Sequence, residues 1–110
     1  MPKLNIKPLS VNKAFKGRRF KTKEYDKYIY DMLMILPNSV EITNGVSLSV
    51  SFVFGYSSRN SDIDNALKCT IDCLVKKYGF DDRYIYELYV RKEIVKKGHE
   101  FIEFNIKEIA

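Results

Sequence analysis

Four aspartates stand in two short stretches of this sequence and could together hold a metal ion. Asp62 and Asp64 are separated by one residue, and Asp81 and Asp82 are adjacent. A hard cation such as Mg²⁺ prefers oxygen ligands, usually a few carboxylates together with water and substrate phosphate. Such an ion activates water and neutralises charge on a phosphate. The chemistry to consider is therefore metal-assisted cleavage of phosphodiester bonds.

Each aspartate pair also has a purely structural explanation. Acids in the first turn of a helix are stabilised by the helix dipole, and aspartates are common in turns. Taken singly, each pair fits that explanation better than a catalytic one. The combination of both pairs in a chain of net charge +5 favours a metal site. A calcium-binding loop starting at Asp62 is excluded, because Leu67 and Cys73 stand where that loop needs Gly and Glu.

Lys68 follows Asp64 by four residues and is expected one helical turn further along the same face. It can form a surface ion pair there, or it can stabilise negative charge on a scissile phosphate. Asp72, one more turn along, is expected to be solvated or paired with Lys76. His99 is the only histidine and is expected in a turn, so a serine or cysteine triad would lack its base.

The composition indicates a globular protein with an anionic partner. The 110 residues, 45% hydrophobic and 30% charged, suit one domain over residues 1–110 with a core of its own. A net charge of +5 suits nucleic acid first and a membrane surface second. Residues 3–21 contain no acid and seven cations, which are Lys3, Lys7, Lys13, Lys16, Arg18, Arg19 and Lys21.

Nothing in the sequence predicts export or membrane insertion. The N-terminal residues lack an apolar signal region, and no apolar run is long enough to span a bilayer. Cys69 and Cys73 lie four residues apart, a spacing at which a disulfide would distort a helix. They are expected to be small core residues in a reducing compartment. We therefore expect a cytoplasmic protein in whatever cell makes it, including a cell that hosts a virus.

The apolar spacing predicts the order β-α-β-α-β-β, with two helices against a small mixed sheet, an α/β or α+β fold. Thr22 is expected to cap the first helix and Ser61 or Asp62 the second, which should end at Gly79. The last two strands are expected to pair as a hairpin through Lys97 and Gly98. The expected ranges are a strand at 3–7, a loop or a loose hairpin around Gly17, a helix at 23–36, a strand at 46–54, a loop at 55–61, a helix from 62, and strands at 84–95 and 101–106.

Asp62 and Asp64 then follow the carboxyl end of a strand, where ligands usually bind in open α/β sheets. Asp81 and Asp82 come after the same helix and open the next strand. The two pairs are therefore expected to occupy adjoining junctions.

The spacing Asp62-Ile63-Asp64-Asn65-Ala66-Leu67-Lys68, followed by Asp72-Cys73-Leu74 and Asp81-Asp82, resembles the signature of the RusA family of Holliday junction resolvases. Pro8-Leu9-Ser10-Val11-Asn12 is similar to the family's opening segment, and the resemblance covers nearly the whole chain. It implies a Mg²⁺-dependent endonuclease, with Mn²⁺ as an expected substitute and no small-molecule cofactor. It also implies a homodimer that acts on branched DNA, above all on four-way junctions, in the cytoplasm of a bacterial cell or a phage-infected host.

Carried over by this resemblance, the catalytic residues are Asp62, Asp64, Lys68 and one of Asp81 and Asp82, with Asp82 preferred. The aspartates are the metal ligands. The candidates for DNA contact are Asn12, Lys13, Lys16, Arg18, Arg19 and Lys21. Phe15 and Phe20 are expected to anchor this segment in the core, with a wedge at the junction centre as the alternative. The strand with Tyr84, Tyr86 and Tyr89 is a candidate dimer interface, although these rings can also belong to the core.

Two rival functions stay open at this level. The first is a nuclease of different selectivity, for flaps, RNA or replication forks. The second is a non-catalytic basic DNA-binding module whose aspartates only cap a helix. Loss of cleavage in Asp64→Asn with binding intact would exclude the second.

Overall fold

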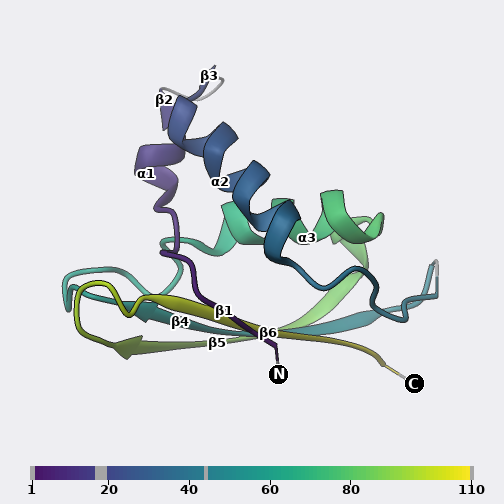
Figure 1. Ribbon diagram of the computed structural model, residues 1–110. Coiled ribbons are helices and arrows are strands. Elements are labelled where there is room, and N and C mark those ends of the chain that lie inside the picture. Colours follow the sequence, from purple (N-terminus) through teal and green to yellow (C-terminus); the bar gives the residue numbers. More distant parts are fainter. Residues whose placement is uncertain (1, 17–19, 44, 110) are drawn as a thin grey trace.

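The computed structural model describes residues 2–16, 20–43 and 45–109. A four-stranded mixed sheet has the strand order β1-β6-β4-β5, and the helices lie on one of its faces (Figure 1). The predicted α+β class and element order are confirmed. The elements are β1 (Lys3–Leu4), α1 (Val11–Ala14), β2 (Phe15–Lys16), β3 (Phe20–Lys21), α2 (Lys23–Ile35), β4 (Leu48–Tyr56), α3 (Leu67–Tyr78), a 3-10 turn η1 (Asp82–Tyr84), β5 (Ile85–Ile94) and β6 (Phe101–Glu108).

The central strand β4 carries the core. Its alternating apolar residues Val50, Phe52 and Phe54 are at most 1% exposed, and the two phenylalanine rings stack 5.3 Å apart. This confirms the predicted period of two, although the strand starts and ends two residues later than the expected 46–54. Burying such rings on the helix-covered face is the main apolar contribution to this fold.

The predicted hairpin between the last two strands is wrong. β4 lies between them, parallel to β5 and antiparallel to β6. The connection at 95–100 passes the end of β4, where the Val95 N–H donates to the Tyr56 carbonyl at 2.8 Å. Both strands were predicted correctly, β5 from its β-forming residues and β6 from its alternation, but neither signal names a partner. A strand that is buried along most of its length, as β4 is, is best placed between two neighbours.

The helix ends agree better with the sequence. The Thr22 hydroxyl accepts from the Tyr25 N–H at 3.2 Å, and Gly79 takes a left-handed φ of 74°, as expected for a cap at each place. Cys69 and Cys73 are buried free thiols, as predicted. The first strand is shorter than expected, and the short helix α1 was not foreseen. Strands β2 and β3 confirm a hairpin, while Gly17 itself lies outside the described residues.

No helix in the described part of the chain is long and apolar enough to cross a membrane.

Candidate metal and nucleic-acid site

Asp62 and Asp64 lie in the loop that leads from the carboxyl end of β4 into α3. Both are exposed. Two backbone bonds shape the loop into successive turns, from the Asn65 N–H to the Asp62 carbonyl and from the Leu67 N–H to the Asp64 carbonyl, each 3.1 Å long. The site thus rests on a defined backbone at the edge of the sheet.

The predicted cap of the second helix is wrong. The helix begins at Leu67, and its N-cap residue Ala66 makes no side-chain hydrogen bond. The residues that the sequence pattern assigned to the first helical turn form these successive turns instead. No hydrogen bond or ion pair between described residues involves the carboxylates of Asp62 and Asp64. The structural explanation for these two aspartates, helix capping, therefore does not hold.

Two residues whose contacts with this loop were not predicted from the sequence attach it to the rest of the fold. The Ser10 hydroxyl donates to the Asn65 amide oxygen at 2.9 Å. From β5, the Lys92 ammonium donates to the Ser61 carbonyl at 2.8 Å and to the Arg59 carbonyl at 3.3 Å. Lys92 sits in a strand with several charged residues, so no sequence signal distinguishes it. The loop is held from both sides, by the N-terminal segment and by the edge strand.

Tyr56 lies beneath the loop as the last residue of β4 and is 6% exposed. Burial raises the pKa of its hydroxyl to about 12, the backbone N–H of Ala66 opposes the rise, and the charge of Asp64 adds to it. The hydroxyl is therefore protonated at neutral pH and lies within electrostatic reach of the Asp64 carboxylate.

Lys68 is exposed in the first turn of α3, and none of the ion pairs between described residues includes it. Asp64 precedes the helix, so the expected pair on one helical face does not exist. Asp72 also differs from its prediction, because it accepts a hydrogen bond from the Tyr25 hydroxyl at 3.2 Å instead of being solvated or paired with Lys76. Lys68 is thus a cation without an ion-pair partner among the described residues, close to the acidic loop.

Asp81 and Asp82 lie at the opposite end of the sheet, so the expected adjoining junctions are wrong. β5 starts beside the start of β4, with Ile85 opposite Leu48, and Asp82 directly precedes β5. The acidic loop instead follows the end of β4, and Figure 1 shows α3 running between the two ends. The 12 residues of α3 span about 18 Å. A parallel β-α-β unit requires this separation, because its helix returns the chain to the starting edge.

The two adjacent aspartates have different surroundings. The Asp81 carboxylate accepts from the Arg83 backbone N–H at 3.1 Å and pairs with the Arg83 guanidinium at 3.3 Å. No hydrogen bond or ion pair in the described part of the chain involves the Asp82 side chain. Of the two, Asp82 is therefore the one whose carboxylate has no partner among the described residues.

A single protomer offers two free carboxylates to a metal and not three. Residues 2–16, 20–43 and 45–109 contain no group of three or more His, Cys, Asp or Glu side chains placed to hold an ion. Asp62 and Asp64 supply the hard oxygen donors that Mg²⁺ prefers, and this ion is often held by one or two carboxylates plus water and substrate phosphates. The donor chemistry fits Mg²⁺, but within one chain the third aspartate lies at the opposite end of the sheet.

The predicted DNA contacts lie beside α1 and the β2–β3 hairpin. Lys13 and Lys21 are exposed, and the Lys21 ammonium lies 4.9 Å from the centre of the Tyr25 ring. Arg18 and Arg19 lie outside the described residues, as do the side chains of Asn12, Lys16, Phe15 and Phe20.

The fold and the site together define a class of protein. It is a small basic α+β domain with two neighbouring free carboxylates and a free lysine after the carboxyl end of its central strand, an arrangement suited to phosphodiester cleavage. The model of the RusA endodeoxyribonuclease family matches residues 7–105. The chain therefore belongs to the RusA family of endodeoxyribonucleases, the Holliday junction resolvases. No curated protein matches it.

Proposed function

We propose that this enzyme hydrolyses branched DNA with the help of Mg²⁺ held by Asp62 and Asp64. The observation that carries the proposal is a pair of exposed, unpaired carboxylates on a loop that is attached at both sides, in a chain of an endodeoxyribonuclease family. When bound, the ion supplies an activated water and neutralises phosphate charge. The Lys68 ammonium stabilises the negative charge that develops on the phosphate. Four-way junctions are the preferred substrate.

The third metal ligand, Asp82, reaches the site from a second copy of the chain. Within one protomer Asp82 lies at the wrong end of the sheet, but a two-fold dimer can correct this. β5 is an edge strand, and two β5 strands related by a two-fold axis pair antiparallel. The start of one strand then lies beside the end of the other. This places the partner subunit's Asp82 near the Asp62–Asp64 loop.

The side chains of β5 support this interface. Tyr86 and Tyr89 are 70% and 59% exposed, and Leu88 is 41% exposed. They are therefore not core residues of the protomer, the alternative considered for this strand. A long edge strand with exposed apolar side chains is a site for pairing with another chain. A homodimer of this kind also matches the near two-fold symmetry of a four-way junction.

Asp64→Asn tests the metal site. The variant should bind a synthetic four-way junction as the wild type does and lose cleavage in Mg²⁺. Asp26→Asn, at an exposed position of α2, removes the same charge as a matched control and should cleave normally. Duplex and flap substrates measure selectivity alongside. Cleavage by Asp64→Asn at the wild-type rate would show that Asp64 does not hold the catalytic metal and would overturn the proposed metal site.

Mixing two inactive variants tests the shared site. A heterodimer of Asp64→Asn with Asp82→Asn contains one site with all aspartates intact if Asp82 acts across the dimer, and none if it acts within its own chain. Random exchange of subunits should then restore roughly a quarter of the wild-type intact sites. A mixture as inactive as its two components contradicts the shared site and leaves the Asp64→Asn result untouched.

A further inference from the structure

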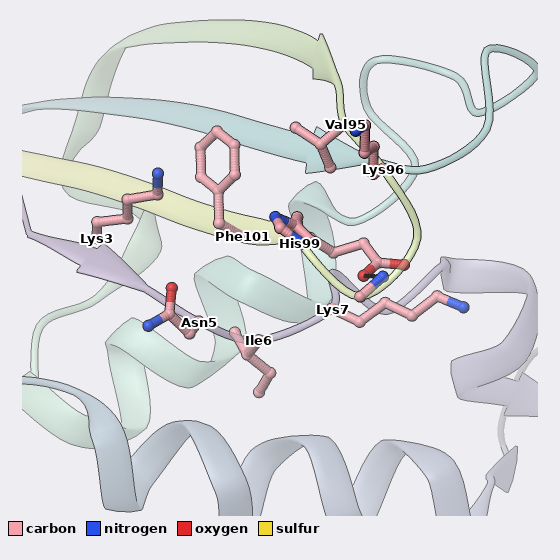
Figure 2. Close-up of a pocket in the computed structure, with 10 residues that line it drawn as sticks. Lys3, Asn5, Ile6, Lys7, Val95, Lys96, His99 and Phe101 are labelled. Carbon is pink, nitrogen blue, oxygen red and sulfur yellow. Dashed lines mark hydrogen bonds between the residues drawn. The ribbon is translucent and has the colours of Figure 1, made fainter.

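A second candidate binding site lies at the same end of the sheet as the acidic loop. It is a pocket of about 460 Å³ between the N-terminal segment and the connection from β5 to β6 (Figure 2). Lys3 and Lys7 line it from one side, and Lys96 and His99 from the other. All four are exposed. Val95, also in its wall, is bonded to the last residue of β4, just before the chain enters the acidic loop.

The floor of the pocket excludes stacking of a base. The Phe101 ring rests on Gly55, where a Cβ atom would come within 2.3 Å of the ring, and Phe101 is only 4% exposed. The Lys3 ammonium lies over this ring, 4.4 Å from its centre. Figure 2 shows the two side chains next to each other. A ligand therefore meets ammonium groups and not an open aromatic face.

Among the described residues that line the pocket, Glu100 is the only acid, and its oxygens already have partners. Its own backbone N–H lowers the pKa of this carboxyl most, with further contributions from the Ser57 hydroxyl, the Gly98 N–H and the charge of Lys7. The Gly98 N–H donates at 2.8 Å. Glu100 thus connects the 95–100 segment to the start of the acidic loop. The pocket contains three lysines and one acid, and the carboxylate of that acid is already used in this connection.

A larger cleft of about 860 Å³ adjoins the pocket but does not have this excess of positive charge. It shares Lys7 and Glu100 with the pocket and extends to Ser61 and Asn65 in the acidic loop. Its three lysines are matched by three acids, and Lys27 and Asp31 are paired at 2.6 Å. The smaller pocket is therefore the anion site, and the cleft connects it to the catalytic loop.

We propose that Lys3, Lys7 and Lys96, with His99, bind the phosphate backbone of the DNA strand that runs through this cleft to the Asp62–Asp64 loop. The inference rests on the proposed DNA substrate and adds a contact surface separate from the basic residues of the β2–β3 region. Lysines act on phosphates as point charges and release counterions when they bind. The site therefore contributes affinity that depends on salt and not on sequence.

The test compares two double variants of the full chain that remove the same charge. Lys7→Ala/Lys96→Ala changes the pocket, and Lys76→Ala/Lys107→Ala removes two exposed lysines on α3 and β6 as the matched control. Binding to a four-way junction is measured in EDTA, without cleavage, at 50 to 200 mM salt. Each lost phosphate contact lowers the slope of log K against log salt by about 0.9. When the salt is lowered from 200 to 50 mM, the affinity of the pocket variant should thus rise by a factor about twelve times smaller than that of the wild type.

The control should keep a slope close to that of the wild type. Equal slopes for the two double variants would overturn the phosphate site and leave the proposed function standing. A wild-type protein without salt-dependent junction binding would overturn both. If the alanine pair lowers the melting temperature, Lys7→Gln/Lys96→Gln keeps an unbranched stem with an uncharged polar end and gives the same reading of the slope.

Discussion

Replacing Lys92 with methionine should loosen the loop that carries Asp62 and Asp64. Methionine keeps an unbranched stem and removes the ammonium that donates to the carbonyls of Ser61 and Arg59. The loop is then held mainly by the bond between Ser10 and Asn65. The change touches no proposed metal ligand, so its effect reports on positioning.

The hydrogen-bond lengths set the size of the effect. The contact to Ser61 is 2.8 Å long and partly buried, whereas the contact to Arg59 is 3.3 Å long and exposed and contributes little. A hydrogen bond from a charged group stabilises by about 1.5–3 kcal/mol. Partial exposure favours the lower end, and about 1.4 kcal/mol corresponds to a tenfold change in an equilibrium. The loop should therefore open about tenfold more often in Lys92→Met.

Hydrogen exchange measures this opening without metal or DNA. The amides of Asn65 and Leu67, whose bonds close the two turns, should exchange about tenfold faster in Lys92→Met and at nearly the wild-type rate in Lys92→Arg. The Mg²⁺ concentration for half-maximal cleavage should rise, at most about tenfold. Lys107→Met, on β6, is the matched control. Wild-type exchange rates at both amides in Lys92→Met would refute the reasoning.

Three further predictions concern packing, capping and pH. Gly55→Ala places a Cβ atom 2.3 Å from the Phe101 ring, and overpacking of about 1–3 kcal/mol should lower the melting temperature; an unchanged value means that the ring moves freely. Thr22→Ala should lower the free energy of unfolding by about 1 kcal/mol in urea titrations, and Thr22→Ser should lose little of it. Burial raises the pKa of Cys69 to about 11 and that of Cys73 to about 12, from 9.0 in the unfolded chain. The stability linked to these thiols is thus complete below pH 9 and declines as the pH rises towards 11 and 12. At pH 8.5, iodoacetamide should label the folded protein far more slowly than the unfolded one.

Much of the fold was predictable because it follows from local chemistry. The Thr22 cap, the Gly79 end and the alternation through Phe52 and Phe54 each depend on a few neighbouring residues, and all three are confirmed. The start of α3 was predicted wrongly, because polar residues before a helix can form either its first turn or separate turns. The contacts of Lys92 and Ser10 with the acidic loop were not predicted, since a long-range contact to a backbone carbonyl or an amide leaves no pattern in the sequence.

The sequence by itself determined which residues can do the chemistry: the spacing of Asp62, Asp64 and Lys68, the adjacent pair Asp81-Asp82, and the excess of positive charge. Only the tertiary structure decided where they lie. Strand pairing is non-local, and the pattern that defines a strand does not select its neighbour. The position of β4 between β5 and β6 sets Asp82 about one helix length from the acidic loop. The tertiary structure also brings the pocket lysines Lys3, Lys7 and Lys96 to the same end of the sheet as that loop. The first consequence favours a site shared between two subunits, and the second gives the DNA a path towards it.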